Sequence, residues 1–163
     1  MQNQQLELSN ILRAIHAGNL DEVGLLAKSN SSLINARSET GRTSLEEAVF
    51  ESQLDIAALL LEEGADANSR DARGWTPLQE ATYNSTVEMA KLLLSHGANV
   101  NTRDNRGRTP LLYAAEDGFE DMVIVLLQNG ADPSIHDSYG QTPLDRAKAE
   151  GKNEIVATLE GYR

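Results

Sequence analysis

The sequence lacks cysteine, has few aromatic residues and contains no long apolar run. Without cysteine there are no disulfides, no thiolate metal ligands and no cysteine nucleophile. The longest apolar runs, residues 56–61 and 122–127, have six residues each. A membrane-spanning helix needs roughly 20 apolar residues, so we expect no membrane insertion.

Basic residues are also scarce. The chain has 14 Lys and Arg residues and 25 Asp and Glu residues, so its net charge is −11. A strongly negative protein is repelled by phosphates, so we expect no nucleic-acid partner. The first residues form neither a basic nor an apolar signal region. We therefore expect a cytoplasmic protein, or also a nuclear one if the host is eukaryotic. The 163 residues suffice for one domain that folds without metal or disulfide.

What the sequence does contain is an internal repeat with a period of 33 residues. The pattern Gly-x-Thr-Pro-Leu-x-x-Ala occurs four times, as GRTSLEEA, GWTPLQEA, GRTPLLYA and GQTPLDRA, beginning at Gly41, Gly74, Gly107 and Gly140. A second motif keeps the same step and is written LLLEEGADANSRD, LLLSHGANVNTRD and VLLQNGADPSIHD. A fixed period of this length is typical of a solenoid.

Each repeat predicts two antiparallel helices. The motif threonine suits a helix N-cap, and proline follows it at the first helical position in three repeats. Three residues after the threonines stand Glu46, Gln79 and Asp145. Of these, Glu46 and Gln79 predict capping boxes, and Leu112 is the exception. Ser52, Ser85, Gly118 and Gly151 predict a break before a second helix, such as Val87–Ser95.

Turn chemistry follows the second helix. Gly64, Gly97 and Gly130 suit the left-handed residue that ends a helix. Asp71, Asp104 and Asp137 each stand three residues before a glycine, which predicts a tight turn capped by the aspartate side chain.

Taken together, these motifs resemble the ankyrin repeat. The resemblance covers nearly the whole chain and implies an all-α ankyrin-repeat solenoid, in which antiparallel helix pairs are joined by β-turn or hairpin fingers. It divides the single domain into an N-terminal capping repeat at 6–40, full repeats at 41–73, 74–106 and 107–139, and a C-terminal capping repeat at 140–163. The sequence departs from the family where the usual histidine of the helix start is absent from every repeat and where Ser44 replaces proline.

No catalytic, cofactor or metal site is indicated by the residues. The three histidines, His16, His96 and His136, are 80 and 40 residues apart, and no pair has the helix-turn spacing of metal ligands. Phosphate-loop and nucleophile-elbow motifs do not occur. We therefore expect no enzyme activity, no cofactor and no metal ion.

Charge is distributed unevenly among the segments. The turn segments 35–42, 68–75, 101–108 and 134–141 contain seven of the ten arginines and only four acidic residues. Their net charge is +3, so the rest of the chain carries −14. A structural interpretation remains open, since arginine beside the turn glycine is common in ankyrin repeats and a solvated ion pair stabilises by about 0–1 kcal/mol.

The resemblance implies that the turn segments project as fingers and bind partners together with the exposed side of each first helix. Carried onto this chain, it identifies a predicted binding set, with Trp75 as its strongest member. The set consists of Arg37, Arg42, Phe50, Arg70, Arg73, Trp75, Tyr83, Arg103, Arg106, Arg108, Glu116, Asp117, His136 and Tyr139. It also implies that the hairpin residues Asn68 and Asn101 are candidates for asparagine hydroxylation, depending on the host.

The function expected from this resemblance is that of a monomeric protein–protein interaction module. The alternative is a small inhibitory or regulatory subunit that occludes an enzyme's active site through its acidic helical face. Salt dependence and charge reversal at Glu116 and Asp117 would distinguish the two.

Overall fold

The computed structural model describes residues 2–39 and 41–162 and folds them into consecutive helix pairs. Thr40 and Arg163, at the predicted ends of the first and last units, lie outside the described residues. Within the described ranges there are ten α-helices, one short 3-10 helix and no strand, which confirms the all-α prediction. None of these helices is both long and apolar enough to cross a membrane. The elements are α1 (Gln2–His16), α2 (Leu20–Ser29), η1 (Ser31–Leu33), α3 (Ser44–Phe50), α4 (Leu54–Glu62), α5 (Pro77–Tyr83), α6 (Val87–Ser95), α7 (Pro110–Asp117), α8 (Glu120–Gln128), α9 (Pro143–Ala149) and α10 (Asn153–Gly161).

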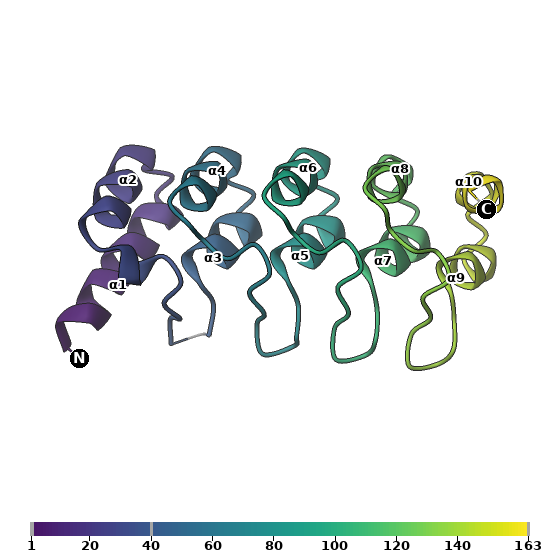
Figure 1. Ribbon diagram of the computed structural model, residues 1–163, viewed down its shortest axis with the longest axis horizontal. Helices are drawn as coiled ribbons and strands as arrows, with labels where there is room; N and C mark the ends of the chain where they lie inside the picture. The colour runs from purple at the N-terminus through teal and green to yellow at the C-terminus, as the bar shows by residue number, and fades with distance from the viewer. Residues whose placement is uncertain (1, 40, 163) are drawn as a thin grey trace.

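The helix pairs stack side by side into an elongated solenoid (Figure 1). One row consists of α1, α3, α5, α7 and α9, which we call the inner helices, and the other consists of α2, α4, α6, α8 and α10, the outer helices. Each helix packs on its pair partner and on its neighbours in the same row. Loops project from the edge formed by the inner helices (Figure 1). This is the solenoid of antiparallel helix pairs and projecting loops that the resemblance to the ankyrin repeat implies.

The inner helices begin where the motif threonines predict. Thr43 caps α3, and its own N–H donates to Glu46 Oε2 at 3.2 Å in the predicted capping box. Gln79 forms the equivalent box with Thr76. The sequence predicted only these two capping boxes. Asp145 forms a third, in which its Oδ2 accepts the N–H of Thr142 at 2.9 Å. The shorter aspartate side chain still reaches the cap.

The break between paired helices requires a left-handed residue in every repeat. Ser52 and Ser85 have φ of 56° and 54°, whereas Gly118 and Gly151 adopt similar angles at the equivalent positions. The predicted helix ends at Gly64, Gly97 and Gly130 also have positive φ. A non-glycine residue in this conformation costs roughly 1–2 kcal/mol. The two serines are therefore strained positions, and the other three units relieve this strain with glycine, at Gly18, Gly118 and Gly151.

The core is a stack of equivalent apolar layers. The motif leucines Leu45, Leu78 and Leu111 are fully buried, as are the motif alanines that follow them. In the last described unit, the equivalent Leu144 is only partly buried, and within residues 41–162 no helix pair lies beyond α9 and α10 to cover it. At the other end Leu25 of α2 is 73% exposed. Each layer thus buries its apolar surface against its neighbours, and the described end layers do so on one side only.

Asparagine side chains join each repeat to the next. Asn101 Nδ2 donates to the carbonyl of Gly130 at 3.2 Å, and its Oδ1 accepts the N–H of Asp132 at 2.8 Å. Asn35 and Asn68 make the same two bonds with the repeats that follow them. The sequence analysis did not predict this asparagine ladder, which fixes the spacing of the loops that begin beside it.

The strain at Ser85 gives a stability prediction. Replacing Ser85→Gly removes the left-handed penalty and increases the entropy of the unfolded chain, for a net gain of roughly 0.5–1 kcal/mol in unfolding free energy. The reverse change, Gly118→Ser, is expected to lower it by a similar amount. Urea unfolding followed by circular dichroism measures both, and a destabilised Ser85→Gly variant would show that the serine is not strained.

A second prediction concerns the asparagine ladder. The substitution Asn101→Ala removes both bonds to the next repeat and is expected to lower the unfolding free energy by roughly 1–2 kcal/mol. Asn84→Ala, at an exposed position that ends α5, serves as the control and should change it by less than about 0.5 kcal/mol. Equal effects of the two substitutions in urea titrations would contradict a coupling role for Asn101.

Candidate protein-binding surface

Four fingers project from the solenoid, and in each of them a side chain forms hydrogen bonds with the backbone of the same finger. We number them finger 1 (35–42), finger 2 (68–75), finger 3 (101–108) and finger 4 (134–141). In finger 2, Asp71 Oδ1 accepts the N–H groups of Arg73 and Trp75 at 2.8 and 2.9 Å. Asp104 and Asp137 do the same in fingers 3 and 4, which confirms the predicted aspartate caps. The tips are therefore held in one conformation by local bonds.

Neighbouring fingers are tied together by arginines at equivalent positions. Arg70 Nη1 donates to the carbonyl of Gly74 in its own finger at 3.0 Å and to that of Arg103 in the next finger at 2.7 Å. Arg103 repeats the pattern, bonding Gly107 and the carbonyl of His136. Arg37 likewise bonds the carbonyl of Gly41 in its own finger. Arg70 and Arg103 of the predicted binding set therefore also cross-link the fingers.

Four finger arginines, Arg37 among them, lie against carboxylates. Arg42 and Arg108 pair with Glu47 and Glu116 of the inner helices, at 3.4 and 3.0 Å. Arg73 contacts both Asp71 and Glu80, and Arg37 lies 3.5 Å from the buried Glu46. Among the described residues, no ion pair involves Arg70, Arg103 or Arg106. The uncompensated positive charge of the fingers is thus concentrated in fingers 2 and 3.

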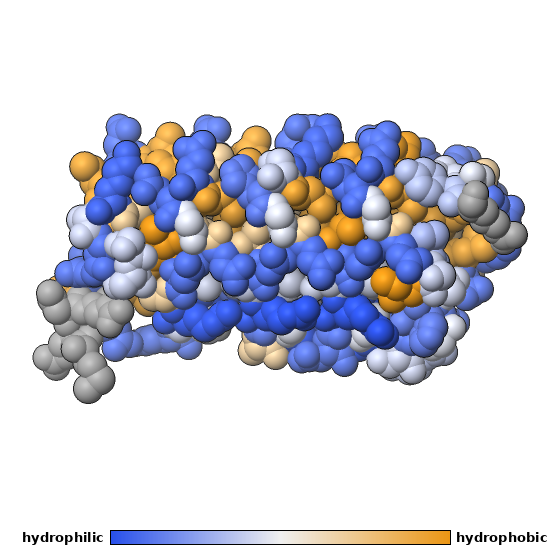
Figure 2. All heavy atoms as spheres, viewed as in Figure 1, coloured by the Kyte–Doolittle hydropathy of each residue, from blue (hydrophilic) through white to orange (hydrophobic). Residues whose placement is uncertain are grey.

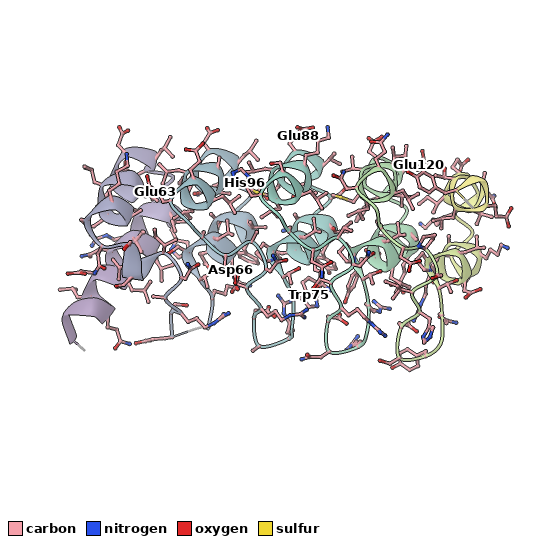
Figure 3. The ribbon with its side chains drawn as sticks, in the orientation of Figure 1. Glu63, Asp66, Trp75, Glu88, His96 and Glu120 are labelled. Atoms are coloured by element: carbon pink, nitrogen blue, oxygen red, sulfur yellow. The ribbon has the colours of Figure 1, made fainter. Side chains whose placement is uncertain are left out.

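An aromatic cluster lies beside these charges. The ring of Trp75 meets those of Tyr83 and Tyr113 edge-on, with centroids 5.4 and 5.2 Å apart. Arg73 lies over the Trp75 ring at 4.3 Å, and Arg108 lies 5.0 Å from the centre of the Tyr113 ring. Trp75 is therefore half-buried and packed, while Tyr83 is 55% exposed. Figure 3 shows Trp75 at the base of the fingers, at the opposite edge of the solenoid from Glu88 on α6.

The remaining predicted residues surround this cluster. Phe50, 44% exposed at the end of α3, lies under the Arg42 guanidinium at 4.0 Å. Tyr139 is exposed at the tip of finger 4, and His136 offers its carbonyl to Arg103. On the face seen in Figure 2, a hydrophilic band runs lengthwise across the molecule with a few apolar atoms within and below it, and more apolar atoms lie above it.

The acidic end of α7 is partly neutralised by neighbouring arginines. Glu116 contacts Arg108 and also Arg146 of the last unit, at 3.0 and 3.4 Å. Burial and the nearby Glu116 carboxylate raise the pKa of Asp117. Asp137 is buried, which opposes ionisation, but the Arg146 guanidinium and two backbone N–H groups lower its pKa below the usual value. The C-terminal end of the surface is therefore a network of paired charges.

The sequence analysis did not predict one row of residues on the inner helices that contact the fingers. Glu47, Glu80, Tyr113 and Arg146 occupy the position directly before the motif alanine, and each contacts a finger residue. The preceding motif position is buried against the core in α3, α5 and α7, at Glu46, Gln79 and Leu112. The signal was present in the repeats, since this position varies between acid, aromatic and base while the alanine that follows it is constant.

Three side chains between α1 and α3 could share a cation. His16 Nε2 lies 2.8 Å from Glu47 Oε1 and 4.0 Å from Glu51 Oε1. The three ligand atoms lie within 4.8 Å of one another. The sequence analysis did not anticipate this group, because His16 and Glu47 are far apart in the chain. In the structure, the hydrogen bond between His16 and Glu47 connects α1 to α3.

The pocket that the cluster forms lies between fingers 2 and 3. It has a volume of about 370 Å³ and is lined by Arg73, Trp75, Asp104, Asn105, Arg106 and Tyr113. Tyr113 donates its hydroxyl to Asp104 Oδ2 at 2.6 Å, which attaches α7 to finger 3. Burial and this bond to the carboxylate raise the pKa of Tyr113 to about 12.

This pKa gives a testable alkaline titration. The folded protein is expected to keep the Tyr113 proton up to pH about 12, whereas an unfolded tyrosine loses it near pH 10. The stability from this group is therefore complete below pH about 10 and is lost as pH rises toward 12. Tyrosinate absorbance should show a late step that disappears in Tyr113→Phe, and an unchanged titration curve in this variant would contradict the assignment.

Comparisons with known proteins agree with this geometry. The model of a family described as ankyrin repeats (3 copies) matches residues 2–71, 65–137 and 106–161. A search of curated proteins finds no match. The family matches together extend from residue 2 to residue 161, and the chain belongs to the ankyrin repeat family.

Proposed function

We propose that this protein binds a partner protein through the surface formed by its fingers and inner helices. Ankyrin repeats are generally protein–protein interaction modules, and the family is a non-catalytic interaction fold. The observation that carries the proposal is the packed cluster of Trp75, Tyr83 and Tyr113 beside the uncompensated arginines of fingers 2 and 3. Tryptophan, tyrosine and arginine are the side chains that most often dominate interface energy.

Rigidity supports the same function. The asparagine ladder and the arginine cross-links hold successive fingers at fixed spacing before any partner arrives. Aspartate caps hold each of the last three fingertips. Less conformational entropy is then lost on association, which favours affinity.

The alternative of an inhibitory subunit with an acidic helical face has less support. Glu116 is already paired with Arg108 and Arg146, so that only Asp117 of this acidic pair is available to a cationic partner. We also propose that the protein acts as a cytoplasmic monomer without a nucleic-acid partner. Its charge of −11 opposes both self-association and contact with phosphates.

Site-specific photo-crosslinking in the host's cells tests the proposed surface. A photoreactive phenylalanine derivative replaces Tyr83 in one variant and Glu88, exposed on the outer helix α6, in the control. A partner protein should crosslink at position 83 and not at 88. Crosslinking of the same protein at 88 alone would contradict the proposal.

The affinity of the captured partner provides the quantitative prediction. Tyr83→Ala removes a half-exposed ring and is expected to weaken binding by about 1–3 kcal/mol with little change in the melting temperature. Asp117→Lys should leave the affinity within about threefold at moderate salt if the acidic face is peripheral. A larger effect at Asp117 than at Tyr83, measured by calorimetry, would favour the inhibitory alternative.

A further inference from the structure

The pocket between fingers 2 and 3 combines an apolar wall with a charged rim. Trp75 and Tyr113 form the aromatic part of its lining. The polar end of Tyr113 is already used, because its hydroxyl is bonded to Asp104. The volume of about 370 Å³ lies at the lower end of the roughly 300–1,000 Å³ of ligand pockets. A space of this size suits one or two side chains of a partner better than a large cofactor.

The rim of the pocket offers a cation. Arg106 is exposed in finger 3 and takes part in no ion pair among the residues the structure describes. Arg73, on the other side of the pocket, is already paired with Asp71 and Glu80. Arg70 and Arg103 bond carbonyl groups only, apart from one bond to a threonine hydroxyl, so their charges remain uncompensated nearby. The local excess of charge is therefore positive in a protein whose net charge is −11.

The lining also limits how much negative charge can enter. The carboxylate of Asp104 belongs to the pocket, and its two oxygens accept bonds from the N–H groups of Arg106 and Arg108 and from Tyr113. Its negative charge is fixed there and repels a second anion placed deep in the pocket. A single carboxylate at the rim, beside Arg106, fits this arrangement better than a phosphate dianion.

We infer that the pocket receives an apolar side chain of a partner segment and that Arg106 binds an Asp or Glu carboxylate next to it in that segment. This inference rests on the proposed function, since it names the kind of segment that the same surface recognises. The aromatic wall supplies apolar contact area, and the arginine supplies a charge-assisted hydrogen bond that fixes the segment's position.

Trp75 is the only tryptophan of the chain and reports directly on the pocket. The full-length protein is used to select binders from a displayed library of random short peptides, and the strongest are synthesised. We expect them to share an apolar residue adjacent to Asp or Glu and to shift the fluorescence of Trp75. Replacing the acidic residue of such a peptide by its amide should weaken binding at least about tenfold.

Matched protein variants assign the effect to Arg106. Arg106→Glu should weaken the acidic peptides at least about tenfold, whereas Arg13→Glu, an equal change of charge at an exposed position of α1, should alter affinity less than about threefold. Arg106→Lys should retain part of the affinity. Circular dichroism melting curves check that all three variants remain folded.

The outcomes separate this inference from the proposed function. Binders that lose affinity in Tyr83→Ala but not in Arg106→Glu would overturn the inference and leave the surface intact as a binding face. A phosphoserine peptide that binds while its glutamate counterpart does not would overturn the carboxylate assignment. A library without binders would also overturn the inference, because the crosslinking at position 83 tests the proposed function independently.

Discussion

Each repeat has apolar residues on the two sides that face its neighbours, and burial of those sides is the interaction on which the rest of the molecule depends. Leu45, Leu78 and Leu111 stack as equivalent layers, so equivalent backbone atoms recur at a constant spacing. That spacing lets a single residue type make the same bond repeatedly. Asn68 and Asn101 reach the next repeat in this way, and Arg70 and Arg103 do so at the fingers.

The surface chemistry follows from this regular scaffold and from residues that break its repetition. At the position before the motif alanine, Glu80 draws Arg73 toward the helix, whereas Tyr113 replaces the acid with a ring beside Trp75. The aromatic cluster thus forms where consecutive repeats differ. Arg106 lies next to this change and has no carboxylate opposite it in the described chain.

Most of the fold could be predicted from local sequence signals. The threonine caps, the breaks at Ser52 and Ser85, and the aspartate turns depend on contacts within a few residues, which the repeated motifs display directly. The third capping box, at Asp145, was not predicted, because capping boxes usually have Glu or Gln at this position and the shorter aspartate reaches the Thr142 N–H only in the folded geometry.

The candidate surface was less predictable, because it depends on contacts between repeats. Sequence position places Arg73 and Arg106 at equivalent points of their fingers, yet Arg73 pairs with Asp71 and Glu80, whereas Arg106 is free of any ion pair in the described residues. Trp75 was expected to be prominent, but its packing between Tyr83 and Tyr113 depends on the spatial register of two consecutive repeats. Binding by the predicted residues stays a prediction.

The arginine cross-links all point in one direction along the chain. Arg70 donates to finger 3 and Arg103 donates to finger 4, while finger 4 has Ser134 and His136 where the earlier fingers have asparagine and arginine. Backbone bonds join the same fingers in the opposite sense, since the N–H of Asn105 donates to the carbonyl of Arg73 and the N–H of Ser138 donates to that of Arg106. A mechanical load applied at the tip of finger 3 is therefore passed through side-chain and backbone bonds to the fingers on both sides.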